Sequence, residues 1–430
     1  MPPSIPGFRK LLPLSSALGL TAVAFGQVED FVPIEDVPPA VLEGSGPDVV
    51  DDVAMDRVED SVDEDAWIPP RETPPYREPR REGFRLGVEM SIAYNDNIFL
   101  SATAPEADFV SKVTPTIVYS KGDPGAGGGF MEFAYRPSAV LFVENSGENR
   151  VDHDTTLAIG YDGAKSSIVY RGAYRQLGDA TPETGARADR SEYESEVRAA
   201  WNATAKVQLE AAVAVTGADY DDRTLADSNS TTGELAVRYA YSEKTELGVE
   251  FSSGSVEVDG APKQDFQRVV TRLTWKPREK WTVNLGIGAE KRDYSNGSDS
   301  FGVFDAQVDW TPREGTSLFV AAYRREDVSA VFAGQNIEVT GIKGGIRQKL
   351  GERWEGTLET GYEINDYKSV SAGAVGGRSD GVFFIQPGVE YTLSDRFKMG
   401  MYYRYGTNDS NNAAFGYDNH QIGLNLKYEF

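Results

Sequence analysis

Strict alternation between apolar and polar residues is the feature that most restricts the fold of this chain. The clearest run, residues 281–289, has Trp, Val, Leu, Ile and Ala at odd positions and Thr, Asn and Gly at even ones. A β-strand directs two such sets to opposite faces. After residue 25 no apolar run reaches about 18 residues, so no transmembrane helix is expected there. The pattern recurs through residues 83–430 and predicts an all-β domain.

Short polar turns interrupt this pattern about every 35 to 43 residues. They fall at residues 162–165, 202–206, 242–245, 277–280, 312–315, 351–353 and 394–396. Longer irregular segments, such as 178–190, 219–230 and 368–378, lie midway between them. Bacterial outer-membrane barrels have short turns at one end and longer loops at the other. The spacing therefore predicts a transmembrane antiparallel up-and-down β-barrel rather than a soluble sandwich or a propeller.

Counting strands between these marks gives 18, with 16 as the alternative. The expected strands are 84–96, 107–120, 129–144, 151–162, 165–178, 190–202, 205–219, 230–241, 245–258, 263–277, 280–294, 299–311, 316–329, 336–349, 353–368, 378–393, 396–408 and 416–430. An even count places both ends of the barrel domain at the short-turn, periplasmic side. Alternation is poor in 316–329 and 336–349, and prolines fall in mid-strand at 115, 137 and 387, so we expect bulges there. No loop is long enough to predict a large constriction.

Tryptophans cluster beside the short turns. Five of the six lie there, each on the apolar face of its strand. Outer-membrane barrels carry aromatic girdles at the membrane interfaces. We therefore predict interface positions for Trp201, Trp275, Trp281, Trp310 and Trp354.

The first 82 residues have a different composition. Residues 1–26 combine Arg9 and Lys10 with an apolar stretch and a small-residue pattern before Gln27, which predicts a secretory signal peptide. Residues 27–66 contain 14 acidic residues and one basic residue, and prolines concentrate just after them. Such a composition buries too little apolar surface to fold. Residues 27–82 are expected to be a disordered acidic and Pro-rich periplasmic segment, with a partner-binding arm or a barrel plug as the alternative.

The last strand alternates up to the final residue. Ile422, Leu424, Leu426, Tyr428 and Phe430 share one face. A terminal aromatic residue on an alternating strand looks like the signal that the barrel-assembly machinery reads. Tyr428 and Phe430 are therefore the predicted assembly signal, and that machinery is an expected partner.

Two segments at the start of the barrel suggest a family. Residues 94–100 (YNDNIFL) and 108–117 (DFVSKVTPTI) resemble the start of the putative β-barrel porin-2 family of bacterial outer-membrane proteins. The resemblance would cover residues 84–430. It implies a barrel without catalytic residues, and some members are similar to barrels encoded with exopolysaccharide export systems.

Composition excludes several classes of site. The chain has no cysteine and two histidines, so disulfides, thiolate sites and a histidine metal cluster are not expected. Its net charge of −24 argues against binding to nucleic acid. Residues 95–97 (Asn-Asp-Asn) could ligate Ca²⁺, but a loop with local side-chain turns is favoured. No cofactor and no metal are predicted.

An 18-stranded barrel can enclose an aqueous lumen. Inward-facing charges then either tune passage through it or only solvate the wall. The pore-lining candidates are Glu246, Glu250, Arg268, Arg272, Glu355, Glu359, Glu363, Lys398 and Arg404, and the inward set also includes Glu192, Glu194, Glu196 and Arg198. The predicted function is a porin-like passive channel for small hydrophilic solutes, surrounded by outer-membrane lipid in the cell outer membrane.

Two other functions were weighed. One is a non-enzymatic component associated with exopolysaccharide export or envelope assembly, with export proteins as partners. The other is a rim enzyme using Asp152, His153 and Asp154. On a strand, His153 would face away from its two neighbours, so we expect no enzyme activity.

Overall fold

In the computed structural model of the protein, residues 82–184, 186–295, 297–370 and 377–430 are described. The predicted signal peptide (1–26) and nearly all of the predicted acidic segment (27–82) lie outside these residues. The described part contains no helix long and apolar enough to cross a membrane.

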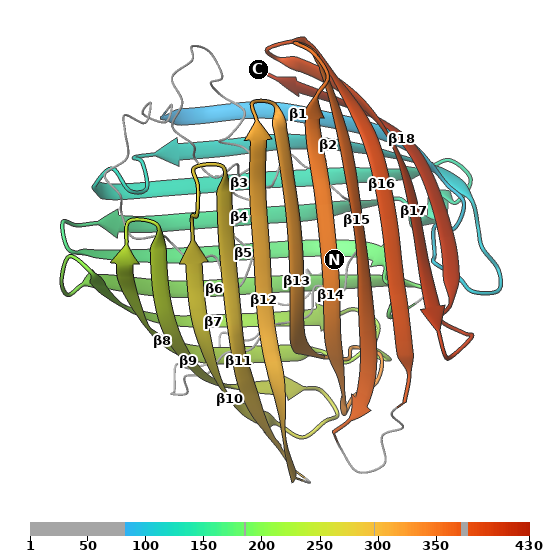
Figure 1. Cartoon of the computed structure of the whole chain (residues 1–430). Coiled ribbons are helices and arrows are strands. Elements are labelled where there is room, and N and C mark those ends of the chain that lie inside the picture. Colours follow the sequence, from blue (N-terminus) through green and yellow to red (C-terminus); the bar gives the residue numbers. More distant parts are fainter. Residues whose placement is uncertain (1–81, 185, 296, 371–376) are drawn as a thin grey trace, which may run out of the picture.

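Eighteen antiparallel strands form a single sheet that closes on itself (Figure 1). Their bounds are β1 (Gly83–Asn95), β2 (Asp108–Lys121), β3 (Gly128–Phe142), β4 (Arg150–Asp162), β5 (Ser166–Ala180), β6 (Arg187–Asn202), β7 (Val207–Tyr220), β8 (Ser228–Ser242), β9 (Thr245–Val258), β10 (Gln264–Trp275), β11 (Trp281–Tyr294), β12 (Gly297–Arg313), β13 (Thr316–Val328), β14 (Gln335–Lys349), β15 (Trp354–Ser369), β16 (Ser379–Ser394), β17 (Phe397–Ser410) and β18 (Tyr417–Glu429). Each strand pairs with the next, and β1 also pairs with β18 from Gly87↔Glu429 to Asn95↔Gln421. The predicted barrel of 18 strands is confirmed.

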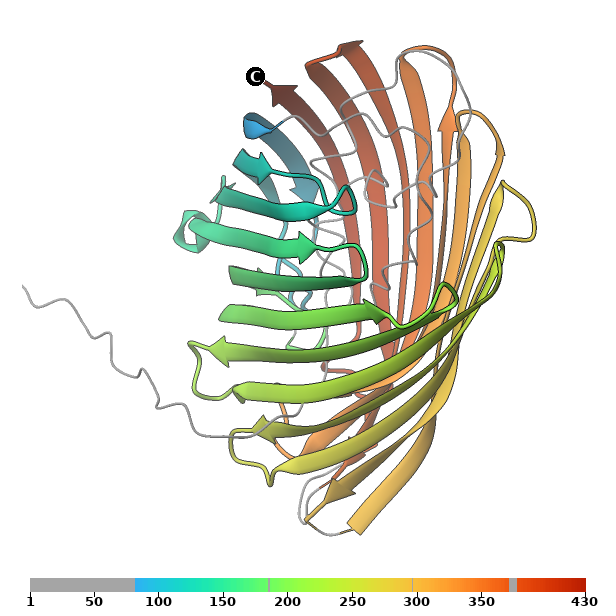
Figure 2. The ribbon, with the colours of Figure 1, turned by 90° about the vertical axis from the view of Figure 1, so that its left-hand side faces the viewer.

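The ring is visible in both ribbon views. Figure 1 shows β1 beside β18, and Figure 2 shows the strands running obliquely around the interior. A closed sheet has no free edge, so its backbone groups can pair in an apolar surrounding.

The connections differ at the two ends of the barrel. Even-numbered strands lead into short turns, such as residues 243–244, 314–315 and 395–396, whereas the first odd-numbered strand leads into residues 96–107. Gly315 has φ of 73°, the left-handed conformation that tight hairpin turns require and glycine adopts without strain. The predicted asymmetry between turns and loops is thus present.

The two faces of the sheet are chemically opposite. Large apolar side chains on one face are exposed, for example Leu235 (63%), Ile287 (57%) and Leu424 (53%). Charged side chains on the other face are buried, for example Arg238 (4%) and Glu250 (4%). A soluble protein would bury the first set. The arrangement fits an outer wall in lipid and a polar interior.

The predicted bulges at the mid-strand prolines are wrong. Between β2 and β3 the backbone pairing is interrupted around Pro115 and Pro137, but the register is the same on both sides of the interruption. The two prolines face each other in that register, so the missing N–H groups fall at one place. Beside Pro387 the rungs also pause without a shift. The register shifts that do occur lie at turns, such as between Trp310 and Arg313.

Residues 316–329 and 336–349, where alternation is poor, form an unbroken hairpin. β13 and β14 pair from Thr316↔Gln348 to Val328↔Asn336 without a register shift. The bulge expected there is therefore wrong as well, and the poor alternation has another cause, which the burial of the hairpin reveals.

Candidate functional site

A continuous chain of opposite charges, here called the wall ladder, lines the inner face of β5 to β10 and β12. It runs through Arg171, Glu196, Arg198, Glu234, Glu210, Arg238, Glu250, Arg272 and Asp305. Arg198 illustrates its geometry, with guanidinium nitrogens 2.8 Å from Glu234 and 3.1 Å from Glu196. Strand register brings these residues together because they lie on the same face, on one strand, on adjacent strands or on strands separated by one other.

The ladder holds its charges against the wall. Arg238 lies 3.6 Å from Glu210 and 3.4 Å from Glu250, and all three are buried. Buried ions are tolerated when each finds an opposite charge and hydrogen bonds. The interior thus presents both signs at short intervals, which suits polar solutes better than apolar ones.

Four predicted pore-lining residues lie in or beside this ladder. Glu250 lies between Arg238 and Arg272, and Arg268 is 3.5 Å from Glu290. Glu246 is buried on the same face as Glu250, alternating with exposed Leu247 and Val249.

The other five lie across β15 and β17. Contacts on this side are pairwise: Glu355 with Arg347 (3.3 Å), Lys398 with Glu390 (3.5 Å), Glu363 with the Tyr323 hydroxyl (2.6 Å), and Arg404 with Gln386 (3.2 Å). Glu359 is 3% exposed on the same face. All nine residues share the inner face. That they line a conducting path stays a prediction.

Sequence reasoning missed several ladder members, including Glu210, Arg238 and Asp305. Each of them alternates along its strand with outward apolar residues; for example, Leu209 precedes Glu210 and Val237 precedes Arg238. Strand parity could therefore have identified them. For the β13–β14 hairpin the sequence signal is the poor alternation of residues 316–329 and 336–349.

The upper part of the β13–β14 hairpin is buried on both faces. Consecutive residues Glu326, Asp327 and Val328 are 5%, 0% and 8% exposed, and Asn336 and Ile337 are also buried. Consecutive strand residues point to opposite faces, so a strand in the barrel wall would expose one of them. Residues 325–337, here called the inner hairpin, therefore lie inside the ring at its loop end.

The tip of the inner hairpin meets loops from around the mouth. The Ala226 N–H donates to the Ala330 carbonyl (2.8 Å), and the Val370 N–H donates to the Gly334 carbonyl (2.9 Å). The Glu183 carboxylate accepts from the Ser329 hydroxyl at 2.6 Å.

Apolar contacts surround these polar ones. Val328 belongs to a buried cluster with Ala226, Val256 and Val258, against which Ala261 packs. The Phe332 and Phe415 rings lie 6.3 Å apart. The tip therefore touches β9 and the loops that follow β5, β7, β9, β15 and β17.

A buried polar cluster holds the base of the inner hairpin. Arg292, 1% exposed, donates to Glu290 at 2.6 Å and lies 3.8 Å from Glu326. The Tyr294 hydroxyl donates to Glu326 at 2.9 Å. Asn336 and Gln264 exchange two amide hydrogen bonds of 2.8 and 2.9 Å. These contacts hold the base of the inner hairpin against the inner face of β10 and β11.

The seam between β12 and β13 is incomplete beside the inner hairpin. Rungs run from Arg313↔Thr316 up to Phe304↔Arg324 and end there. Both strands continue further, β12 back to Gly297 and β13 on to Val328. No loop was expected to fold in as a large constriction, and the residues that lie inside the ring here belong instead to the adjoining ends of β13 and β14.

The rim residues weighed as catalytic do not assemble. The His153 Nδ1 lies 2.9 Å from the Tyr135 hydroxyl on the outer face. Asp152 pairs with Arg150 (3.0 Å) and Asp154 with Arg136 (3.6 Å) on the inner face.

Residues 95–97 hold the start of the loop after β1 against β18. The Asn97 amide donates to the Asp418 carbonyl at 3.1 Å, and Asp96 accepts from the His420 N–H at 2.7 Å. Within the described ranges, no group of three or more His, Cys, Asp or Glu residues could hold a metal ion.

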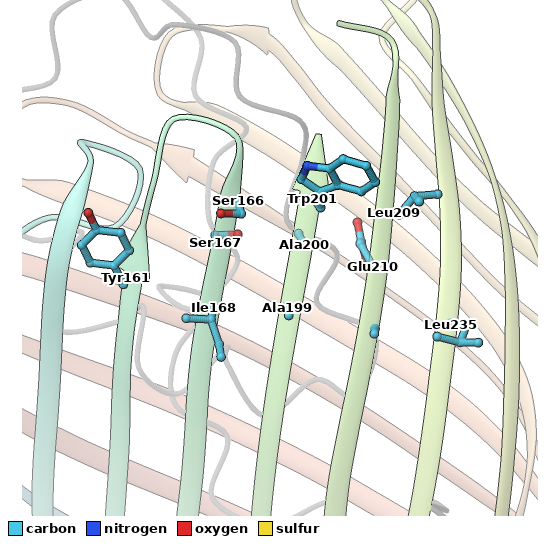
Figure 3. A pocket seen from close by; sticks show the side chains of 11 residues that line it. Tyr161, Ser166, Ser167, Ile168, Ala199, Ala200, Trp201, Leu209, Glu210 and Leu235 are labelled. Carbon is cyan, nitrogen blue, oxygen red and sulfur yellow. The ribbon is translucent and has the colours of Figure 1, made fainter. Parts of the chain in front are cut away.

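The predicted interface tryptophans lie beside the short turns. Trp201, Trp275 and Trp354 are 52%, 45% and 50% exposed, and the Trp281 and Trp310 rings stack at 4.9 Å. Figure 3 shows Trp201 near the turn end, over a shallow depression of about 470 Å³ between strands. Their role at a membrane interface stays a prediction.

The C-terminal residues complete the ring. The Phe430 N–H donates to the Leu86 carbonyl at 2.9 Å, and the Tyr428 and Phe430 rings lie 5.0 Å apart. Phe430 is 70% exposed. Their use as an assembly signal is not tested by this geometry.

The family model described as Putative beta-barrel porin 2 matches residues 300–430. This confirms the family resemblance, although through a different segment from residues 94–117, which suggested it. No curated protein matches the sequence.

Solved structures include several similar barrels. OccK2 (OpdF) of Pseudomonas aeruginosa is 10% identical over 81% of this chain and 98% of its own, with a TM-score of 0.45. The siderophore receptor PirA of Acinetobacter baumannii is 7% identical over 81% of each chain, with a TM-score of 0.44. The FrpB iron transporter of Neisseria meningitidis is 10% identical over 80% of this chain and 81% of its own, with a TM-score of 0.43.

Proposed function

We propose that this chain, whose residues 300–430 match a β-barrel porin family, is a passive channel for small hydrophilic solutes in the bacterial outer membrane. The wall ladder is the observation that carries the proposal. A polar interior is what a water-filled outer-membrane barrel presents to its lumen. Here paired charges of both signs line the inner face from β5 to β12.

The membrane setting rests on the outer face. Its exposed apolar residues and tryptophans match an apolar band with an aromatic girdle. Outer-membrane lipid and, through Tyr428 and Phe430, the barrel-assembly machinery are the proposed partners. The proposal involves no chemical step, so the protein acts as a channel and not as an enzyme. Association with polysaccharide export remains an untested alternative.

Planar-bilayer recording of the refolded protein tests the channel. We expect discrete conductance steps in KCl once insertion has been verified. Bilayers that stay sealed despite verified insertion, at every applied voltage and with the mouth opened as described below, would contradict it.

A charge variant tests the role of the ladder. Arg198→Gln leaves Glu196, Glu210 and Glu234 without their shared cation, so the reversal potential in a KCl gradient should move towards cation selectivity. Lys291→Gln is the matched control, because it removes the same charge from a side chain that is also ion-paired, 2.7 Å from Asp293, but is exposed on the outer face. Equal shifts in both variants would mean that the ladder does not face the conducting path.

A further inference from the structure

The inner hairpin lies in the mouth of the proposed channel. The edge of β13 within it could also pair with β12. If the rungs between β12 and β13 continued beyond Phe304↔Arg324, the same register would pair Gly302 with Glu326 and Ser300 with Val328. These positions all lie within the described residues, and they do not pair with each other. Both edges carry backbone N–H and C=O groups that a continued ladder would satisfy.

The contacts that hold the inner hairpin inward are those of an interface that can separate. Its tip is held by side-chain and backbone hydrogen bonds to Glu183, Ala226 and Val370, beside apolar contacts of Val328 and of the Phe332 and Phe415 rings. Contacts between parts of one chain that are polar and limited in area permit relative motion. A larger apolar core at the tip would not.

The contacts at the base of the inner hairpin are also compatible with two positions of the hairpin. Arg292 contacts both Glu290, on its own strand, and Glu326, on the inner hairpin. When Glu326 leaves, Arg292 retains a carboxylate partner, so no isolated buried charge results.

We propose that residues 325–337 form a gate with two states: latched across the outer mouth as described, or paired with residues 300–303 of β12 so that the barrel wall is complete and the lumen is open. The switch exchanges mouth contacts for four further rungs. Two packings that differ by a few kcal/mol can interconvert in this way. This gate rests on the proposed channel, because it regulates the same lumen.

Engineered disulfides test the gate cleanly because the chain has no cysteine. A Cβ built on Gly260 would lie 3.5 Å from the Ala333 Cβ, within the separation of about 3.5–4.5 Å that a disulfide spans. The pair Gly260→Cys with Ala333→Cys should therefore lock the latched state. Gly260 has φ of 79°, which strains other residues, so Ala226→Cys with Ala330→Cys serves as a second latched lock.

The pair Ser300→Cys with Val328→Cys should lock the open state. In the latched state Val328 packs against Ala226, Val256 and Val258, away from β12. A disulfide to residue 300 can therefore form only when the inner hairpin pairs with β12. The control is Ala306→Cys with Ala322→Cys, an existing rung lower on the same seam.

Oxidation in lipid bilayers, read on a non-reducing gel, gives the first result. We expect the control pair, at least one latched pair and the Ser300/Val328 pair all to crosslink. A Ser300/Val328 pair that stays reduced while the control pair oxidises would overturn the gate. This readout needs no current, so it separates failure of the gate from failure of the channel.

Conductance gives the second result. The oxidised latched pair should lose most of the conductance, the oxidised open pair should hold it at its highest level, and reductant should reverse both changes. A latched disulfide that forms without changing the current would also overturn the gate. Crosslinking of the open pair without any conductance would instead contradict the channel and leave the two-state hairpin in place.

Discussion

The wall ladder and the inner hairpin both bury charge inside the barrel, but they do so by different means. Ladder contacts between different strands join residues 12 to 36 positions apart, such as Arg198 with Glu210 and with Glu234. Contacts of the inner hairpin reach further, from Asn336 to Gln264 at 72 positions and from Ser329 to Glu183 at 146. The ladder follows from the register of neighbouring strands, whereas the inner hairpin depends on loops that can approach or separate independently.

The largest expected effect comes from removing the buried arginine at the base of the inner hairpin. Arg292→Met removes the buried cation that contacts both Glu290 and Glu326, and removing one partner from a buried ion pair costs about 3–5 kcal/mol. We expect a lower unfolding temperature and faster crosslinking of the Ser300/Val328 pair. Arg171→Met is the control, since Arg171 lies in the ladder, pairs with Glu196 and is 22% exposed. Equal losses in both variants would erase the distinction between the two regions.

A smaller effect measures the amide pair at the base. Asn336 and Gln264 exchange two hydrogen bonds, each worth about 1 kcal/mol net. A double-mutant cycle with Asn336→Ala and Gln264→Ala should give a coupling free energy of about 1–2 kcal/mol in urea unfolding. A cycle on Thr114 and Ser138, whose hydroxyls lie 2.6 Å apart in the wall, provides the comparison. Purely additive losses at Asn336 and Gln264 would mean that the amide pair does not fasten the hairpin.

Acidity should bias the latch. Burial raises the pKa of Glu183 above its ordinary 4.5, although Arg378 and the Ser329 hydroxyl oppose the shift. In an open state this loop carboxyl returns to water and to its ordinary pKa. A raised pKa in the latched state means that protonation favours latching, and that this preference is lost as the pH rises through the raised pKa.

Conductance should therefore fall as the pH is lowered from neutral towards 4.5. Glu183→Gln should flatten this dependence, whereas Glu148→Gln in the preceding outer loop should leave it intact. A conductance that rises on acidification in the native protein would reverse the sign and contradict the latch.

The smallest expected effect tests whether a residue matters only because it is next to Gln264 in the sequence. Lys263 precedes Gln264 in the loop, but its ion pair with Glu257 is exposed on both sides, at 46% and 64%. Exposed pairs contribute about 0–1 kcal/mol. Lys263→Ala should therefore leave both stability and Ser300/Val328 crosslinking nearly unchanged, as measured in the same assays. A large effect would show that the whole loop, and not the Gln264 amide, holds the hairpin.

Sequence predicted the wall well because alternation and turns are local. The expected strands start and end within three residues of the observed ones; the largest difference is at β6, which begins at Arg187 and not at 190. The nine pore-lining candidates all reached the inner face for the same reason, since parity along a strand decides facing.

The inner hairpin could not be predicted because its environment is set by distant partners. Residues 316–329 and 336–349 were flagged by poor alternation, which is what burial on both faces produces. Nothing local connects Glu326 to Arg292 or Asn336 to Gln264. The prolines show the same limit: their mutual pairing across β2 and β3 depends on the register of two strands, which neither proline reveals.

The closure between β1 and β18 has a kinetic consequence. All other strand pairs join neighbours along the chain, so each hairpin can form from a short stretch. The closing seam ties residues such as Asn97 and Asp418, and Asp96 and His420, which are 321 and 324 positions apart. Contacts of such long sequence separation slow folding, because the entropy of the loop is lost before they form. We therefore expect the pairing of β1 with β18 to form more slowly than the pairings between strands adjacent in the chain.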